Sequence, residues 1–358
     1  MGIDKAKSPT IIDVAREAGV SKSAVSRALL GQGDVSPETV ERVRAAADRL
    51  GYVPNAMARG LVSQRTKTLG LVLRDTTIQF YGYLQAAIQR RAAQLGYEVV
   101  SVTGVDELTP EDAREALRSL ISLRVDGLIV SSAQLPGADL VQYVDRVPIV
   151  VAGRAEYSQG VVSVHCDEED GGMRIAEYVA RLGHRDVAVL LVSEKDSASQ
   201  NARGRAMIGA LQALDVNVRV IGLDTYRGPV GSSVVTVLAD PAITAVMCPS
   251  DVAMVKVLEE LRIRSIPVPE QLSVTGYDAF GYLAEPLFGF TSFRQPIEEI
   301  AKTAVDRLVE WIEQGAPSET RTALAGVVVP GRTAAPPRGG TQMLGAARNQ
   351  LRAGSVGE

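Results

Sequence analysis

Along roughly the first fifty residues, apolar side chains recur at helical spacing in three short runs. The first run, IIDVAREAGV, follows Thr10, a candidate N-cap, and stops at Gly19. The second, SKSAVSRALL, comes after a turn of about three residues, and the third, SPETVERVRAAADRLGY, opens with the serine and proline typical of a helix start. The pattern predicts a small bundle of three helices.

The first two of these helices have the spacing of a helix-turn-helix unit, whose second helix enters the major groove of DNA. Lys22, Ser23 and Arg27 lie on the polar side of the second helix, where side chains can reach base edges, and Ser21 and Ser26 can donate to phosphates. An ordinary amphipathic surface helix has the same pattern. The residues alone leave both interpretations open.

From about Leu69 the pattern changes to apolar runs that alternate with amphipathic stretches. TLGLVL, EVVSV, VDGLIVSS and VPIVVAG are typical of buried parallel strands, and YLQAAIQRRAAQLG and EDAREALRSLIS are typical of crossover helices. The alternation restarts at GGMRIAEYVARLGH and continues to QLSVTGYD. The sequence therefore predicts an α/β core of two doubly wound parallel-sheet units, with a single large enzyme domain as the alternative.

Charge and composition indicate which segment could contact a polyanion and in which cellular compartment the protein works. Of the 38 Lys and Arg and 42 Asp and Glu in the 358 residues, ten basic and seven acidic residues precede Lys67, so the small basic bias lies in the helical segment. The two cysteines, Cys166 and Cys248, suit a reducing compartment, and the chain has no early apolar targeting segment or long uncharged run. We expect a cytoplasmic protein without a membrane partner.

Candidate catalytic chemistry is sparse. His165 and His184 have no neighbouring ligands at metal-binding spacing, and the glycine-rich motifs of serine hydrolases, P-loop proteins and dinucleotide enzymes do not follow the predicted strands. We therefore expect no enzymatic activity, no metal and no cofactor. Polar and aromatic residues at the predicted strand ends instead suit binding of a small polyhydroxylated or charged molecule, namely Asp75, Phe80, Tyr81, Arg154, Arg203, Asp251 and Asp278.

The stretch PTIIDVAREAGVSKSAVSRALLGQGDVSPETVERVRAAADRLGYVPNAMARGLVSQRT closely resembles the headpiece of the LacI/GalR family of bacterial transcriptional regulators. LGLVLRD, RVDGLIV, LGH, VPEQLSVTGYD and FTSFRQP follow in the family's order through about Thr333. The resemblance implies a helix-turn-helix headpiece (1–55), a hinge helix and linker (56–66) and a periplasmic-binding-protein-like core (67–335). Its first subdomain would comprise about 67–165 and 291–322, and its second about 166–290 and 323–335, before a flexible tail (336–358).

The resemblance also assigns roles to individual residues. It implies that Lys22, Ser23 and Arg27 read the bases. It also implies that four residues contact the DNA backbone, namely Thr10, Ser21, Ser26 and Asn55. In the hinge, Ala58 lies near the minor groove and Leu61 is the apolar wedge that kinks DNA. Effector contacts fall to the strand-end residues Phe80, Tyr81, Arg203, Asp251 and Asp278 and, in addition, to Tyr226.

Several positions depart from the family pattern. Ile78 and Gln79 replace the usual Asn-Pro, Ser250 replaces Asn, and Ala206 and Met207 replace Gly and an aromatic residue. Pro330 stands where an arginine is frequent, and in the headpiece Ala24 and Leu30 replace Thr and Asn. These departures bear on the identity of the effector and on one or two phosphate contacts.

The implied function is a homodimeric repressor that reads a pseudo-palindromic operator and is controlled by a sugar-like or other small metabolite bound between the core subdomains. The tail has no leucine heptad, which favours dimers over tail-linked tetramers. The alternative is a solute-binding protein of the same core fold without a regulatory function.

Overall fold

The computed structural model describes residues 9–30, 35–52, 65–104, 108–132, 135–223, 225 and 228–338. The first two ranges form the predicted three helices, α1 (Ile11–Ala18), α2 (Lys22–Leu30) and α3 (Pro37–Leu50). Their core consists of small apolar side chains at the predicted spacing, Val14, Ala15, Ala18, Val25, Ala28, Val43, Ala46 and Ala47. Small side chains let the three helices approach closely, which gives a compact unit from few residues.

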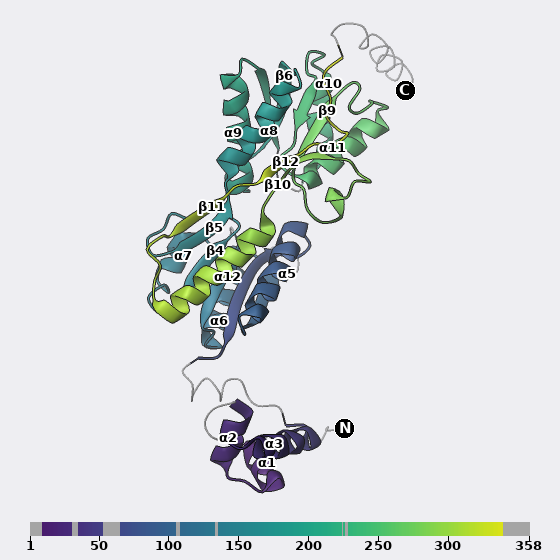
Figure 1. Cartoon of the computed structure of the whole chain (residues 1–358). Helices are drawn as coiled ribbons and strands as arrows, with labels where there is room; N and C mark the ends of the chain where they lie inside the picture. Colours follow the sequence, from purple (N-terminus) through teal and green to yellow (C-terminus); the bar gives the residue numbers. More distant parts are fainter. Residues whose placement is uncertain are drawn as a thin grey trace, which may run out of the picture.

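The remaining elements build two six-stranded sheets (Figure 1). The first has the order β11-β5-β4-β3-β1-β2 and is parallel throughout. Its strands are β1 (Thr68–Asp75), β2 (Glu98–Gly104), β3 (Gly127–Ser131), β4 (Ile149–Ala152), β5 (Val162–Cys166) and β11 (Arg321–Leu324). Helices α5 (Gln79–Gln94) and α12 (Ile297–Gln314) cover one face, and α6 (Pro110–Ser122) and α7 (Gly137–Val141) the other.

The second sheet has the order β12-β10-β9-β8-β6-β7, in which only the edge strand β12 is antiparallel to its neighbour. Its strands are β6 (Asp186–Val192), β7 (Asn217–Leu223), β8 (Ala245–Met247), β9 (Ser273–Asp278), β10 (Thr291–Arg294) and β12 (Val327–Val329). Helices α8 (Glu168–Arg181) and α9 (Ala198–Ala213) cover one face, and α10 (Gly231–Leu238) and α11 (Asp251–Ile263) the other. A short 3₁₀ helix, η1 (Gly281–Ala284), follows β9.

The chain passes between the two sheets after β5, after β10 and after β11. The second crossing differs from the predicted boundary, because residues 291–294 lie in the second subdomain rather than the first. β10 pairs with β9 along four residues, and Phe293 is fully buried against Tyr277, with ring centroids 4.6 Å apart. The first subdomain resumes at α12.

No helix within the described ranges is both long enough and apolar enough to cross a lipid bilayer. Of the predicted tail, residues 339–358 lie outside the described residues.

Candidate functional site

The polar face of α2 is held outward by the packing of its opposite face. Val25 and Ala28 are buried against the other two headpiece helices. Ser21 caps the helix, because its hydroxyl oxygen accepts a hydrogen bond from the backbone N–H of Ala24 at 3.1 Å. This geometry leaves Lys22, Ser23 and Arg27 exposed and Ser26 partly exposed on one solvent-facing surface.

The predicted backbone-contacting residue Thr10 has a structural task as well. It forms a capping box with Asp13 at the start of α1, in which its hydroxyl donates to the Asp13 carboxylate at 2.7 Å. Thr10 is exposed, so phosphate contact would compete with this hydrogen bond. The other predicted DNA contacts, Asn55, Ala58 and Leu61, and the predicted effector contact Tyr226 lie outside the described residues.

Between the two subdomains lies a cavity of about 540 Å³ at the carboxyl ends of the strands. This is where open parallel sheets bind ligands. Of the predicted effector residues that the structure describes, Phe80, Tyr81, Arg154, Arg203 and Asp278 line the cavity. The wall also includes several residues not predicted as contacts, among them Arg74, Gln79, Gln200, Ser250, Lys256 and Gln295.

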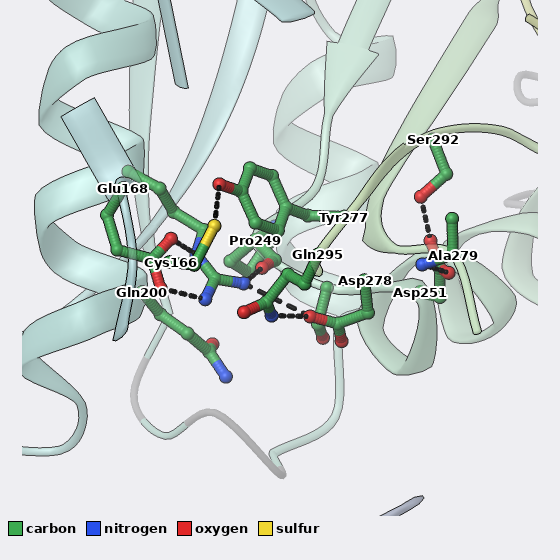
Figure 2. A network of polar contacts seen from close by, with 12 residues as sticks. Cys166, Glu168, Gln200, Pro249, Asp251, Tyr277, Asp278, Ala279, Ser292 and Gln295 are labelled. Carbon is green, nitrogen blue, oxygen red and sulfur yellow. Dashed lines mark hydrogen bonds and ion pairs between the residues drawn. The ribbon is translucent and has the colours of Figure 1, made fainter. Parts of the chain in front are cut away.

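Arg203 lies at the centre of a buried polar network, and Figure 2 shows its partners Glu168, Pro249 and Asp278. Its Nε and Nη2 donate to both oxygens of Glu168 at 2.8 and 2.7 Å, a bidentate pair. Its Nη1 donates to the carbonyl of Pro249 at 3.1 Å and to Oδ1 of Asp278 at 3.3 Å. The guanidinium also lies 3.9 Å from the centre of the Tyr277 ring.

Asp278 and its neighbour form a strained turn at the end of β9. Asp278 has a φ of 124° and Ala279 a φ of 45°, both in the region that favours glycine. Gln295 donates to Oδ1 of Asp278 at 2.7 Å. Burial raises the pKa of Asp278 to about 6, although Arg203 and Gln295 act to lower it.

Asp251 is not part of the cavity wall but stabilises this turn through a hydrogen bond. Its carboxylate accepts hydrogen bonds from the hydroxyl of Ser292 on β10 at 2.6 Å and from the backbone N–H of Ala279, directly after β9, at 2.8 Å (Figure 2). The residue is 2% exposed. Burial, followed by the charge of Asp278, raises the pKa of Asp251 to about 7. Asp251 therefore acts on the cleft by positioning Asp278.

Two other predicted contacts also have protein partners. Arg154 lines the cavity, but it pairs with Glu156 at 2.6 Å and donates to the carbonyl of Leu135 at 2.6 Å. Burial alone would raise the pKa of Glu156, but the hydrogen bond from Arg154 and those from Ser158 lower it to about 2. Asp75 is fully buried and accepts hydrogen bonds from the Thr77 backbone N–H and hydroxyl, so it holds the turn before α5.

The residue most important to the network that sequence reasoning missed is Glu168. It is the first residue of α8, two positions after the end of β5, so the strand-end rule could have found it. Gln295 belongs to the FTSFRQP motif and follows β10 directly, so it carried the same signal. Gln200 had only helical spacing from Arg203 as a signal.

Comparison with known proteins agrees with both parts of this architecture. Residues 10–55 match the family model described as bacterial regulatory proteins, lacI family, and residues 176–334 match a periplasmic binding protein-like domain. The chain is 28% identical over 320 residues to the HTH-type transcriptional regulator AscG of Escherichia coli (strain K12), which covers 87% of this chain and 95% of the relative. It is 29% identical over 307 residues to the sucrose operon repressor of Pediococcus pentosaceus, which covers 85% and 93%.

Among solved structures, the Lac repressor dimer bound to operator and the anti-inducer ONPF superposes with a TM-score of 0.80 at 25% identity, covering 92% of this chain and all of that one. The predicted fold class and family resemblance are therefore confirmed. The named relatives are transcriptional regulators. The chain therefore combines a DNA-binding domain of the bacterial lacI family with a periplasmic binding protein-like core, and over most of its length it is similar to transcriptional regulators.

Proposed function

We propose that this protein is a homodimeric transcriptional repressor that reads a pseudo-palindromic operator through two copies of α2. The observation that carries the proposal is the joint exposure of Lys22, Ser23 and Arg27 on a capped helix whose other face is buried. Arginine and lysine at such positions read guanine edges in the major groove, and serine serves either bases or phosphates. A twofold symmetric dimer requires two half-sites.

A second copy of the chain would cover exposed apolar side chains near the cleft. Tyr282, Leu287 and Phe288 are exposed by 59%, 82% and 40%, and the Tyr282 and Phe288 rings lie 6.3 Å apart. Val252 and Val255 on α11 are exposed as well. Exposed apolar side chains of this kind favour a protein interface, and a twofold interface between two copies would bury the same surface on each.

The cleft would receive the effector and couple it to DNA binding. Two sets of contacts cross between the subdomains beside the cavity. Arg74 donates to the carbonyl of Asp196 at 3.3 Å, and Phe280 packs on Phe80 and Tyr83 with ring centroids 6.2 and 5.6 Å apart. A ligand in the cavity would change these contacts and the angle between the subdomains. Coupling of this kind shifts the affinity for DNA by about 1–3 kcal/mol.

The same proposal places the protein in the cytoplasm, where operator DNA is accessible. It includes a small-molecule effector but no resident cofactor or metal and no catalytic step. Arg203, the most deeply buried cation of the cavity wall, is held by carboxylates and a carbonyl, as suits binding without turnover.

The experiment that tests this function is a selection of bound sequences from random double-stranded DNA with the intact protein in moderate salt. We expect recovery of a pseudo-palindrome whose half-sites are lost when Arg27 is replaced by alanine. Binding without sequence preference and with only the steep salt dependence of phosphate contacts would contradict the proposal.

A further inference from the structure

In the cleft, the hydrogen-bond donors of Arg203 are directed at groups of the protein itself. The carboxylate of Glu168 accepts hydrogen bonds from both Nε and Nη2 of Arg203, and Arg203 is only 4% exposed. Pro249 and Asp278 accept from Nη1. The guanidinium donors of Arg203 are therefore bonded to acceptors of the protein. Without these acceptors, the same donors could bind a carboxylate, a phosphate or a pair of hydroxyls of a ligand.

The network around Arg203 carries more negative than positive charge. Glu168 and Asp278 are two carboxylates in contact with one guanidinium. The charge of Asp278 also helps to raise the pKa of Asp251, a third buried acidic residue. Excess negative charge in a buried cluster is costly, and a cation placed beside it relieves that cost.

Two residues of the cavity wall carry a side-chain oxygen that accepts no hydrogen bond from the described residues. Oε1 of Gln200 is buried and accepts no hydrogen bond from the described residues, and Gln200 lies one helical turn before Arg203 on α9. Oδ2 of Asp278 likewise has no hydrogen-bond donor among the described residues, and the side chain keeps 16% exposure. Figure 2 shows both side chains beside the network. The aromatic rings of Phe80 and Tyr81, which line the same cavity, add surfaces that suit a cation.

The other basic residues of the cavity wall have partners within the protein. Arg154 is neutralised by Glu156. Arg74 donates to the carbonyl of Asp196, and Lys256 donates to the carbonyl of Gly228 at 3.1 Å. These contacts hold the cations at the walls, whereas Oε1 of Gln200 and Oδ2 of Asp278 have no hydrogen-bond donor among the described residues.

We propose that the effector carries a protonated amine, which Asp278 and Gln200 bind, and that Glu168 sets this preference by occupying Arg203. The inference rests on the proposed function, since it takes the cleft as the effector site. It predicts discrimination against ligands that present an anion to this end of the cavity.

The test measures binding by calorimetry and thermal shift at neutral pH with amines and their hydroxyl counterparts. The probes are glucosamine with glucose, glucamine with sorbitol and putrescine with butanediol, together with glucuronate as an anionic probe. We expect at least one amine to bind about tenfold or more tightly than its hydroxyl counterpart, and glucuronate not to bind. Equal binding of the counterparts, binding of none of the amines at millimolar concentration, or binding of glucuronate would each overturn the inference.

Two variants assign the preference to residues. Glu168→Gln should weaken amine binding by about tenfold or more and allow glucuronate to bind, because the fork of Arg203 becomes available. Its matched control is Glu169→Gln, which removes the same charge from the next, exposed residue and should change neither. If Glu168→Gln does not fold, Gln200→Leu leaves every pair of Arg203 intact and should still weaken the amine selectively. An amine affinity unaffected by Gln200→Leu would contradict the assignment.

The DNA selection separates the two proposals. A chain that selects a pseudo-palindrome but shows no amine preference refutes the inference alone. A chain without sequence preference refutes the proposed function, whatever binds in its cleft.

Discussion

The recognition helix and the wall of the cleft use polar side chains in opposite ways. On α2, Lys22 and Arg27 project from a helix held by small apolar residues. Within the described part of the chain, Arg27 makes a single hydrogen bond, at 3.4 Å to the carbonyl of Ser23 in its own helix. In the cleft, Arg203 is buried and contacts Glu168, Asp278 and Pro249. In the headpiece, the residues that would bind DNA differ from those that stabilise the fold. In the cleft, the same residues line the cavity and stabilise the fold.

This difference predicts the largest effect for Arg203→Ala. The substitution would leave Glu168 and Asp278 buried without their cation, which should lower the free energy of unfolding by about 3–5 kcal/mol. In a core of this size that corresponds to a melting temperature roughly 10 °C lower, measurable by calorimetry.

Arg205→Ala is the matched control, because Arg205 lies on the same helix but is exposed, and among the described residues its side chain makes one hydrogen bond, to Asn201. It should change the free energy of unfolding by less than about 1 kcal/mol. Similar losses for both variants would mean that the buried network contributes no more than an exposed one.

Asp251 and Glu156 are both buried, but their pKa values shift in opposite directions, so substitutions at the two residues should respond differently to pH. The raised pKa of Asp251, about 7, means that this group contributes stability that is fully present below its unfolded pKa near 4 and is lost as the pH rises through 7. Asp251→Asn removes this titration. The melting temperature of the variant relative to the wild type should therefore increase between about pH 5 and pH 7.5, as scanning fluorimetry at both values can measure.

The stability contributed by Glu156 should depend on pH in the opposite direction. Its pKa of about 2 means that its contribution is present at neutral pH and is lost as the pH falls below about 4.5. The penalty of Glu156→Gln should thus be largest at neutral pH and shrink in acid. If both variants respond to pH in the same direction, the environments assigned to the two carboxylates are wrong.

Local patterns in the sequence were sufficient to predict the headpiece and the alternation of the core. Apolar periodicity marks the helices, and Gly19, with a φ of 65°, ends α1 where the pattern stops. Each of these features depends on residues close together in the chain. The resemblance to a family then supplied roles for single residues that periodicity does not encode.

The cleft was harder to predict because its contacts depend on how distant elements pack. Asp251 follows a strand, which favours a ligand contact, yet its carboxylate turns into the protein beside Gly276, where a Cβ would lie 2.1 Å from Oδ1. Glu168 meets Arg203 only because α8 packs on α9, 35 positions along the chain. The crossing after β10 was misplaced for the same reason, since FTSFR suits a strand of either sheet.

On α2, a substitution should change DNA binding without changing folding. Arg27→Ala should remove about 1–3 kcal/mol of discrimination at one position of each half-site, because an arginine that reads a base edge contributes that much. The core melting temperature should stay unchanged, since Arg27 is exposed on the headpiece and its hydrogen bond in the part of the chain that the structure describes is to Ser23 of its own helix. Arg181→Ala removes a similar exposed charge from α8 and should affect neither property. A uniform loss of affinity over all sequences, with selectivity retained, would make Arg27 a phosphate contact instead, and the base-reading surface would then reduce to Lys22 and Ser23.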